Sequence, residues 1–197
     1  MRGALAFAAL LCCTACPPTQ LPGDQAMGSW AMTADSFSRG ACRVGEVTDT
    51  GFTFDLVLTR DSKTDAAWVT LAGHSREGTF DGQYLVNEAS ATRTFPSCSE
   101  CDTLMFERIE VAVLSSSQSS ALGSACPDTV LEDGGVPAPN DAGITGPGQT
   151  ALGFDAARLC GFLTTRLQST GTHADGGDCA VDCSDCEVKY KLRGDRR

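Results

Sequence analysis

The chain has 197 residues, a formal net charge of −10 at pH 7 and a hydrophobic content of 42%. This length suits one or two domains. The acidic balance argues against a nucleic-acid-binding protein and against direct binding to anionic lipid, because both surfaces would repel the chain. Eleven cysteines are typical of an exported protein with disulfide bonds rather than of a cytoplasmic one.

The first 16 residues have the three parts of an export signal. Arg2 opens the segment, an apolar run covers residues 4–13, and the small residues Thr14 and Ala15 precede Cys16. The run is shorter than the roughly 20 residues that a membrane-spanning helix needs. We therefore expect a signal peptide over 1–15 and, because prolines follow at once, a polar tether over 16–27.

The end of this segment, LLCCTAC, resembles the lipobox of bacterial lipoproteins. In that family the cysteine is acylated and becomes the mature N-terminus, so the resemblance implies lipidation of Cys16. Cys12 and Cys13 are rival sites, but a bulky leucine precedes Cys12, whereas the small Ala15 precedes Cys16. Pro17 is not the aspartate that favours inner-membrane retention in enterobacterial lipoproteins, which indicates a lipid anchor in the outer membrane of the cell envelope. An ordinary signal cleavage that leaves a soluble exported protein stays open.

From Gly28 to the C-terminus, apolar and polar residues alternate with the period of half-buried strands. The alternation is clearest in SWAMTA (29–34), GFTFDLVLTRD (51–61) and CEVKYKLRG (186–194). The runs AAWVTLAG and GTFDGQYLV predict two more strands, and Gly73 to Gly78 between them is typical of a turn.

Two later segments are less regular. The run from Leu104 to Leu114 changes its apolar face near Arg108, which is typical of a strand with a β-bulge. Residues 154–170, FDAARLCGFLTTRLQST, fit either a helix or a strand, and the two threonines favour the strand.

Residues 127–150 are rich in proline, glycine and acidic side chains and contain few large apolar residues, so we expect a flexible, disordered loop there. The segment after this loop is too small for a core of its own. We therefore predict a single domain over 28–197 in which the last strands return across the loop to pair with the part that precedes it. The predicted fold is all-β, an antiparallel meander that forms a small, disulfide-stapled barrel or sandwich.

The cysteines after the signal segment predict the disulfides. Their even number in an exported chain indicates a disulfide framework. They are Cys42, Cys98, Cys101, Cys126, Cys160, Cys179, Cys183 and Cys186. The two CxxC pairs, in SCSECD and DCSDCE, leave a four-thiolate zinc site open as an alternative.

The stretch MGSWAM is similar to the GxW motif that opens the first strand of lipocalin-type β-barrels, and Gly28 and Trp30 carry the match. This resemblance implies that Trp30 closes the base of a barrel. The large aromatic residues of the predicted strands would then line a ligand cavity or fill a dry core. They are Trp30, Phe52, Phe54, Trp68 and Tyr84.

The sequence contains none of the motifs GxSxG, HExxH, GxxxxGK or GxGxxG, and we predict no catalytic residues, no resident metal and no cofactor. We expect a noncatalytic envelope lipoprotein whose β body binds a small apolar ligand or an envelope protein, or is a structural module. The alternative is an exported enzyme with an acidic site that the sequence does not reveal, which would collect several carboxylates in one pocket.

Overall fold

The computed structural model describes residues 21–40, 50–95, 101–124, 126–128, 135–169 and 185–197. Several predicted features lie outside these ranges. They are the signal peptide 1–15, the lipidation site Cys16, and Cys42, Cys98, Cys179 and Cys183.

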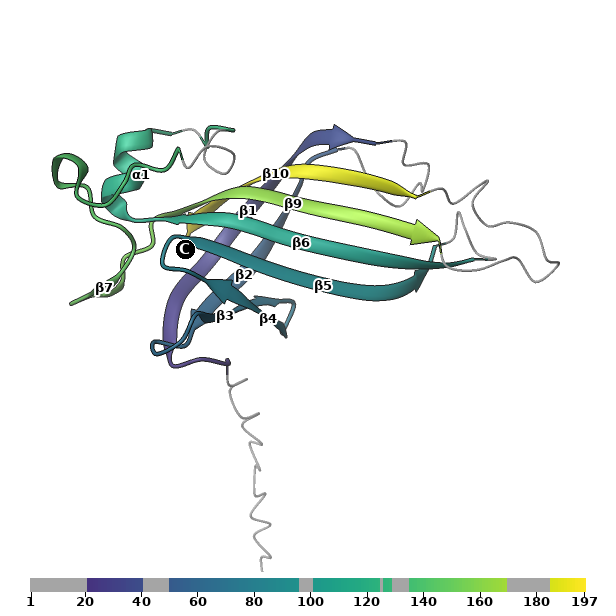
Figure 1. Ribbon diagram of the computed structural model, residues 1–197, viewed down its shortest axis with the longest axis horizontal. Coiled ribbons are helices and arrows are strands. Elements are labelled where there is room, and N and C mark those ends of the chain that lie inside the picture. Colours follow the sequence, from purple (N-terminus) through teal and green to yellow (C-terminus); the bar gives the residue numbers. More distant parts are fainter. Residues whose placement is uncertain (1–20, 41–49, 96–100, 125, 129–134, 170–184) are drawn as a thin grey trace, which may run out of the picture.

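Eight antiparallel strands form a closed barrel, which confirms the predicted fold class (Figure 1). In their order around the barrel, the strands are β1 (Gln25–Arg39), β10 (Cys186–Arg196), β9 (Arg158–Ser169), β6 (Asp102–Leu114), β5 (Tyr84–Thr94), β4 (His74–Phe80), β3 (Ala66–Leu71) and β2 (Phe52–Arg60). The elements outside the barrel are the helix α1 (Ser116–Leu122), the 3-10 turn η2 (Asp141–Gly143) and a small hairpin of β7 (Gln149–Thr150) and β8 (Gly153–Phe154).

Apolar and polar residues alternate along the strands because successive side chains face the lumen and the exterior of the barrel. Trp30, Met32 and Ala34 of β1 are buried inside the barrel, as are Val188 and Leu192 of β10. Residues 154–170, whose sequence fits either a helix or a strand, contain the strand β9, as predicted. β9 and β10 complete the barrel by pairing with β6 and β1.

The prediction of a turn over Gly73 to Gly78 is wrong. The chain reverses within Ala72 and Gly73, which have φ values of 48° and 82°, and β4 begins directly afterwards. Two residues with positive φ make the tight connection whose twist matches paired antiparallel strands. A second turn at Asp81 and Gly82 separates β4 from β5, and the Asp81 carboxylate accepts hydrogen bonds from two following backbone N–H groups.

The predicted bulge in β6 is also wrong, because β6 pairs with β5 and β9 in unbroken register across Arg108. Ala112 and Leu114 face outward but are buried beneath Cys126 and Val136 in a second apolar cluster. The apparent change of face therefore arises because this half of β6 is covered on both sides.

One end of the barrel, here called the base, holds the start of β1 and the end of β2. Phe154 and Ala156 are buried against it. The Arg196 guanidinium donates to both of their carbonyl oxygens, at 2.9 and 3.0 Å. The Phe154 ring packs edge-on against Phe80, and the Arg60 guanidinium lies over both rings. The base is thus plugged by side chains and by the segment that follows β8.

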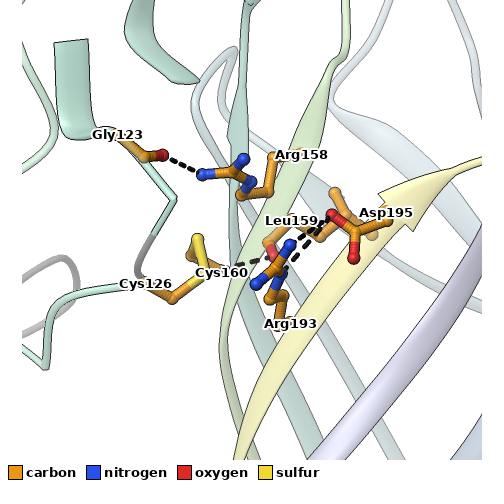
Figure 2. Close-up of polar contacts among 7 residues, drawn as sticks. All are labelled: Gly123, Cys126, Arg158, Leu159, Cys160, Arg193 and Asp195. Carbon is orange, nitrogen blue, oxygen red and sulfur yellow. Dashed lines mark hydrogen bonds and ion pairs between the residues drawn. A yellow bond between two sulfur atoms is a disulfide. The ribbon is translucent and has the colours of Figure 1, made fainter. Parts of the chain in front are cut away.

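A disulfide between Cys126 and Cys160 attaches the segment after α1 to the outer side of β9 (Figure 2). Beside it, the Arg158 guanidinium donates to the carbonyl of Gly123. Cys101 and Cys186 are disulfide-bonded as well. The chain is therefore disulfide-stapled, as predicted.

Residues 135–150, the described end of the stretch predicted to be flexible, form hydrogen bonds to the region of α1. The side-chain amide of Gln118 donates to the Pro137 carbonyl at 2.9 Å. The backbone N–H of Thr145 donates to the Ser117 hydroxyl at 2.8 Å. Val136 is buried against the barrel. These contacts hold residues 135–150 beside α1.

Candidate functional site

The lumen is packed at the base and hollow at the opposite end, here called the mouth. A cavity of about 450 Å³ opens there, within the range of small-molecule binding sites. Side chains of β2, β3, β4, β6, β9 and β10 and the residue after β5 line it. They are Phe52, Phe54, Leu71, Arg76, Phe95, Met105, Glu107, Ile109, Leu163, Thr165 and Tyr190.

One wall of the cavity is aromatic. The rings of Phe52 and Phe54 have centroids 5.7 Å apart, and Phe52 meets Tyr190 edge-on at 5.1 Å. Both phenylalanines are partly buried and pack against the barrel core. Such a wall offers an apolar surface from which a ligand can displace water.

The described side chains of the cavity that carry polar groups are Arg76 of β4, Glu107 of β6, Thr165 of β9 and, through its hydroxyl, Tyr190 of β10. Nη1 of Arg76 donates to Oε2 of Glu107 at 2.8 Å. Glu107 and Thr165 lie opposite each other in the register of β6 and β9. Along β6, Glu107 lies between Met105 and Ile109, so the ion pair sits between apolar layers of the lumen.

The ion pair is partly desolvated. The exposed fractions of the two side chains are 34% for Arg76 and 25% for Glu107. Attraction between charges is stronger at such a site than in open water, and losing one partner leaves the other charge without compensation. The two charges cancel, so the pair places charged groups but no net charge inside a mostly apolar cavity.

The barrel wall around the cavity is shortest at β3 and β4, which end before the neighbouring strands do. Figure 1 shows the long strands β5, β6, β9 and β10 running past the short β3–β4 hairpin. β2 pairs with β3 only over Val57–Arg60, and β4 pairs with β5 only over Gly78–Phe80. Within the described residues, the rest of β2 pairs with β1 alone and the rest of β5 with β6 alone. Phe52 and Phe54 of β2 and Phe95, which follows β5, line the cavity, so these two edges border it.

Asn87 holds β4 in place where its pairing with β5 ends. Its side-chain amide donates to the carbonyls of Arg76 and Glu77 at 3.1 and 2.8 Å. The neighbouring Gly78 allows a close approach, because a Cβ there would overlap the backbone of Val86. These two residues fix the backbone from which Arg76 reaches Glu107.

The five aromatic residues predicted to line a cavity lie in different places. Phe52 and Phe54 line it. Trp30 is fully buried in the core of the barrel. Trp68 alternates with the core residues on β3 and lies on its outer side, and Tyr84 packs against the outer cluster around Cys126.

The two charged residues of the cavity are not evident from the sequence pattern. Arg76 fell in the stretch interpreted as a turn, and Glu107 fell where the pattern of β6 changes face. Both belong to strands with polar residues at consecutive positions, so their alternation gives no signal. The shared register of Glu107 and Thr165 becomes evident only once β6 and β9 are paired.

The described residues contain no cluster of three His, Cys, Asp or Glu side chains placed to hold a metal ion. Of the two CxxC pairs, Cys101 and Cys186 are in disulfides, whereas Cys98 and Cys183 lie outside the described ranges. In the same part of the chain, none of the helices is both long and apolar enough to cross a membrane.

Comparison with known proteins gives no matching family model, no matching curated sequence and no matching solved structure.

Proposed function

We propose that this protein is an exported, lipid-anchored envelope lipoprotein whose noncatalytic barrel binds a small, largely apolar ligand at its mouth. The observation that carries the proposal is the cavity of about 450 Å³ at the mouth of a barrel whose base is filled by side chains. A closed barrel of eight strands has an interior that side chains can fill or that can hold one small ligand. Here side chains fill the base of the barrel, whereas the mouth has room for a small ligand.

The physical gain comes from the apolar walls of the cavity. Phe52, Phe54, Met105 and Leu163 line it together with other apolar side chains. Burial of apolar surface contributes roughly 25 cal/mol for each Å² removed from water. A ligand with an apolar body therefore gains most of its affinity from these walls, and the polar groups fix its orientation.

The similarity to lipocalin-type barrels supports the same function. Gly28 and Trp30 carry that similarity, and Trp30 is fully buried. The Arg196 guanidinium, which binds the plug at the base, lies next to Gly28. Among the described residues, no such plug fills the cavity at the mouth, at the other end of the barrel.

The test of the cavity uses the neutral fluorophore N-phenyl-1-naphthylamine, whose emission rises when it leaves water. We expect saturable binding by the wild-type protein. Met105→Trp fills the cavity and should weaken binding at least tenfold. Phe106→Trp is the matched control, because Phe106 is the next residue along β6 and its side chain is exposed on the outer face. No saturable binding by the wild type, or equal binding by Met105→Trp, would contradict the proposal.

The proposed anchor rests on LLCCTAC and on the short chain between it and the barrel, since β1 begins at Gln25. Stable anchoring takes more than one acyl chain, which bacterial lipoproteins carry on this cysteine. Cys16→Ser should move the protein from the membrane fraction to the soluble fraction, whereas Cys12→Ser should not. Membrane association that survives Cys16→Ser would point to Cys12, Cys13 or an uncleaved signal.

A further inference from the structure

In the part of the chain that the structure describes, the charged side chains that line the mouth cavity are Arg76 and Glu107, and they neutralise each other. Their contact joins Nη1 of the guanidinium to Oε2 of the carboxylate. A guanidinium has five N–H donors and a carboxylate has two acceptor oxygens, so both groups retain hydrogen-bonding capacity beyond this contact. The hydroxyl of Thr165 adds a donor and an acceptor on the same wall.

This balance penalises a charged ligand. A carboxylate that binds Arg76 competes with Glu107 and leaves two negative charges near one guanidinium. An ammonium that binds Glu107 competes with Arg76 and leaves two positive charges near one carboxylate. Both outcomes weaken a pair that is only about one-third and one-quarter exposed to solvent, where an uncompensated charge is costly.

A neutral polar group avoids this penalty. A hydroxyl, carbonyl or amide can accept from the guanidinium or, when it carries a proton, donate to the carboxylate while the ion pair stays intact. A site built to hydrogen-bond such a group also discriminates against molecules that lack it. The apolar body of the ligand would lie against the aromatic wall of Phe52, Phe54 and Tyr190.

We infer that the mouth cavity selects a neutral amphipathic ligand, with an apolar body and one hydroxyl, carbonyl or amide group, over fatty acids and alkylamines. This inference rests on the proposed function, because it specifies the ligand of the same cavity. The Arg76–Glu107 pair is the selecting element. Each member excludes ligands that carry its own type of charge: Glu107 excludes carboxylates, and Arg76 excludes ammonium groups.

The test compares three ligands of equal chain length, 1-dodecanol, dodecanoate and dodecylammonium, as competitors of N-phenyl-1-naphthylamine on the full chain at pH 7. For the wild type we expect dodecanol to compete at a concentration at least tenfold lower than either charged ligand. Glu107→Gln removes the competing carboxylate and should shift the preference toward dodecanoate at least tenfold. Arg76→Gln should shift it toward dodecylammonium by a similar factor.

Matched controls come from the outer face of β6, where Arg108 forms an ion pair with Glu110 at 3.1 Å. Glu110→Gln and Arg108→Gln remove the same charges from the protein but not from the cavity, and they should leave the ligand preference of the wild type unchanged. If these controls shift the preference as much as the cavity variants, net charge and not the cavity pair is responsible, and the inference is overturned.

The remaining outcomes are distinct. Dodecanoate that competes with the wild type as well as dodecanol does overturns the inference while leaving the cavity function intact. An unchanged preference in Glu107→Gln and Arg76→Gln overturns it as well. If one of these two variants fails to fold, the other and the wild-type comparison decide. If none of the three ligands competes and the fluorophore itself does not bind, the proposed function fails, and the inference fails with it.

Discussion

The disulfide between Cys126 and Cys160 should contribute several kcal/mol to the stability of the barrel. It closes a loop with a sequence separation of 34 residues. In the chain-entropy model, a cross-link across about 34 residues destabilises the unfolded state by about 4 kcal/mol at 25 °C. We expect the double variant Cys126→Ala, Cys160→Ala, with all other bridges left oxidised, to lose roughly this amount.

Urea unfolding of the two proteins, followed by circular dichroism, measures the difference. The same loss lowers the Tm by about 8 to 16 °C, since about 2 to 4 °C accompany each kcal/mol in a chain of this size. The m-value should rise, because an unfolded chain without the cross-link exposes more surface. A loss below about 1 kcal/mol would refute the reasoning. A large loss with an unchanged m-value would place the effect in the packing of the folded state instead.

Three further predictions concern single side chains. Gly161→Ala should destabilise the barrel by about 2 to 3 kcal/mol in urea unfolding, because an added Cβ overlaps the backbone of β6, whereas Gly148→Ala, with open space around it, should change stability by less than about 0.5 kcal/mol. Hydrogen bonds from the hydroxyl and then the backbone N–H of Ser62 lower the pKa of Asp24 below 3.8, so Ser62→Ala should raise that pKa in an NMR titration. Stability from this contact is present above pH 3.8 and is lost as the pH falls through the lowered pKa; an unshifted titration would contradict the assignment. Asn87→Ala should cost about 1 to 3 kcal/mol, because two carbonyls of β4 lose their donor, and a smaller loss would mean that water replaces the amide.

The sequence predicts the class of fold well because the main signal is local. A half-buried strand places every second side chain in the lumen, so β2 and β10 are evident from their alternation alone. The signal fails where a strand is covered on both faces. Ala112 and Leu114 of β6 are buried under Val136, a residue distant in the sequence, and their pattern therefore imitates a bulge.

The candidate site could be predicted only in part. Phe52 and Phe54 stand on the inner face of an evident strand. The placement of Trp68 and Tyr84 depends on which face of β3 and β5 points inward. The sequence pattern does not reveal that, because β3 is short and β5 has polar residues at consecutive positions. Whether an inward aromatic residue meets another side chain or empty space is a matter of packing volume, which depends on all the strands together.

We propose that the mouth cavity of a lipid-anchored barrel holds a ligand. Native mass spectrometry of the protein extracted from its own envelope, alongside the Met105→Trp variant, tests it most directly. We predict a chain that begins at Cys16, carries acyl mass and retains a noncovalent organic adduct that Met105→Trp loses. A wild-type protein without any adduct, or an adduct equally abundant in the filled variant, would contradict the claim.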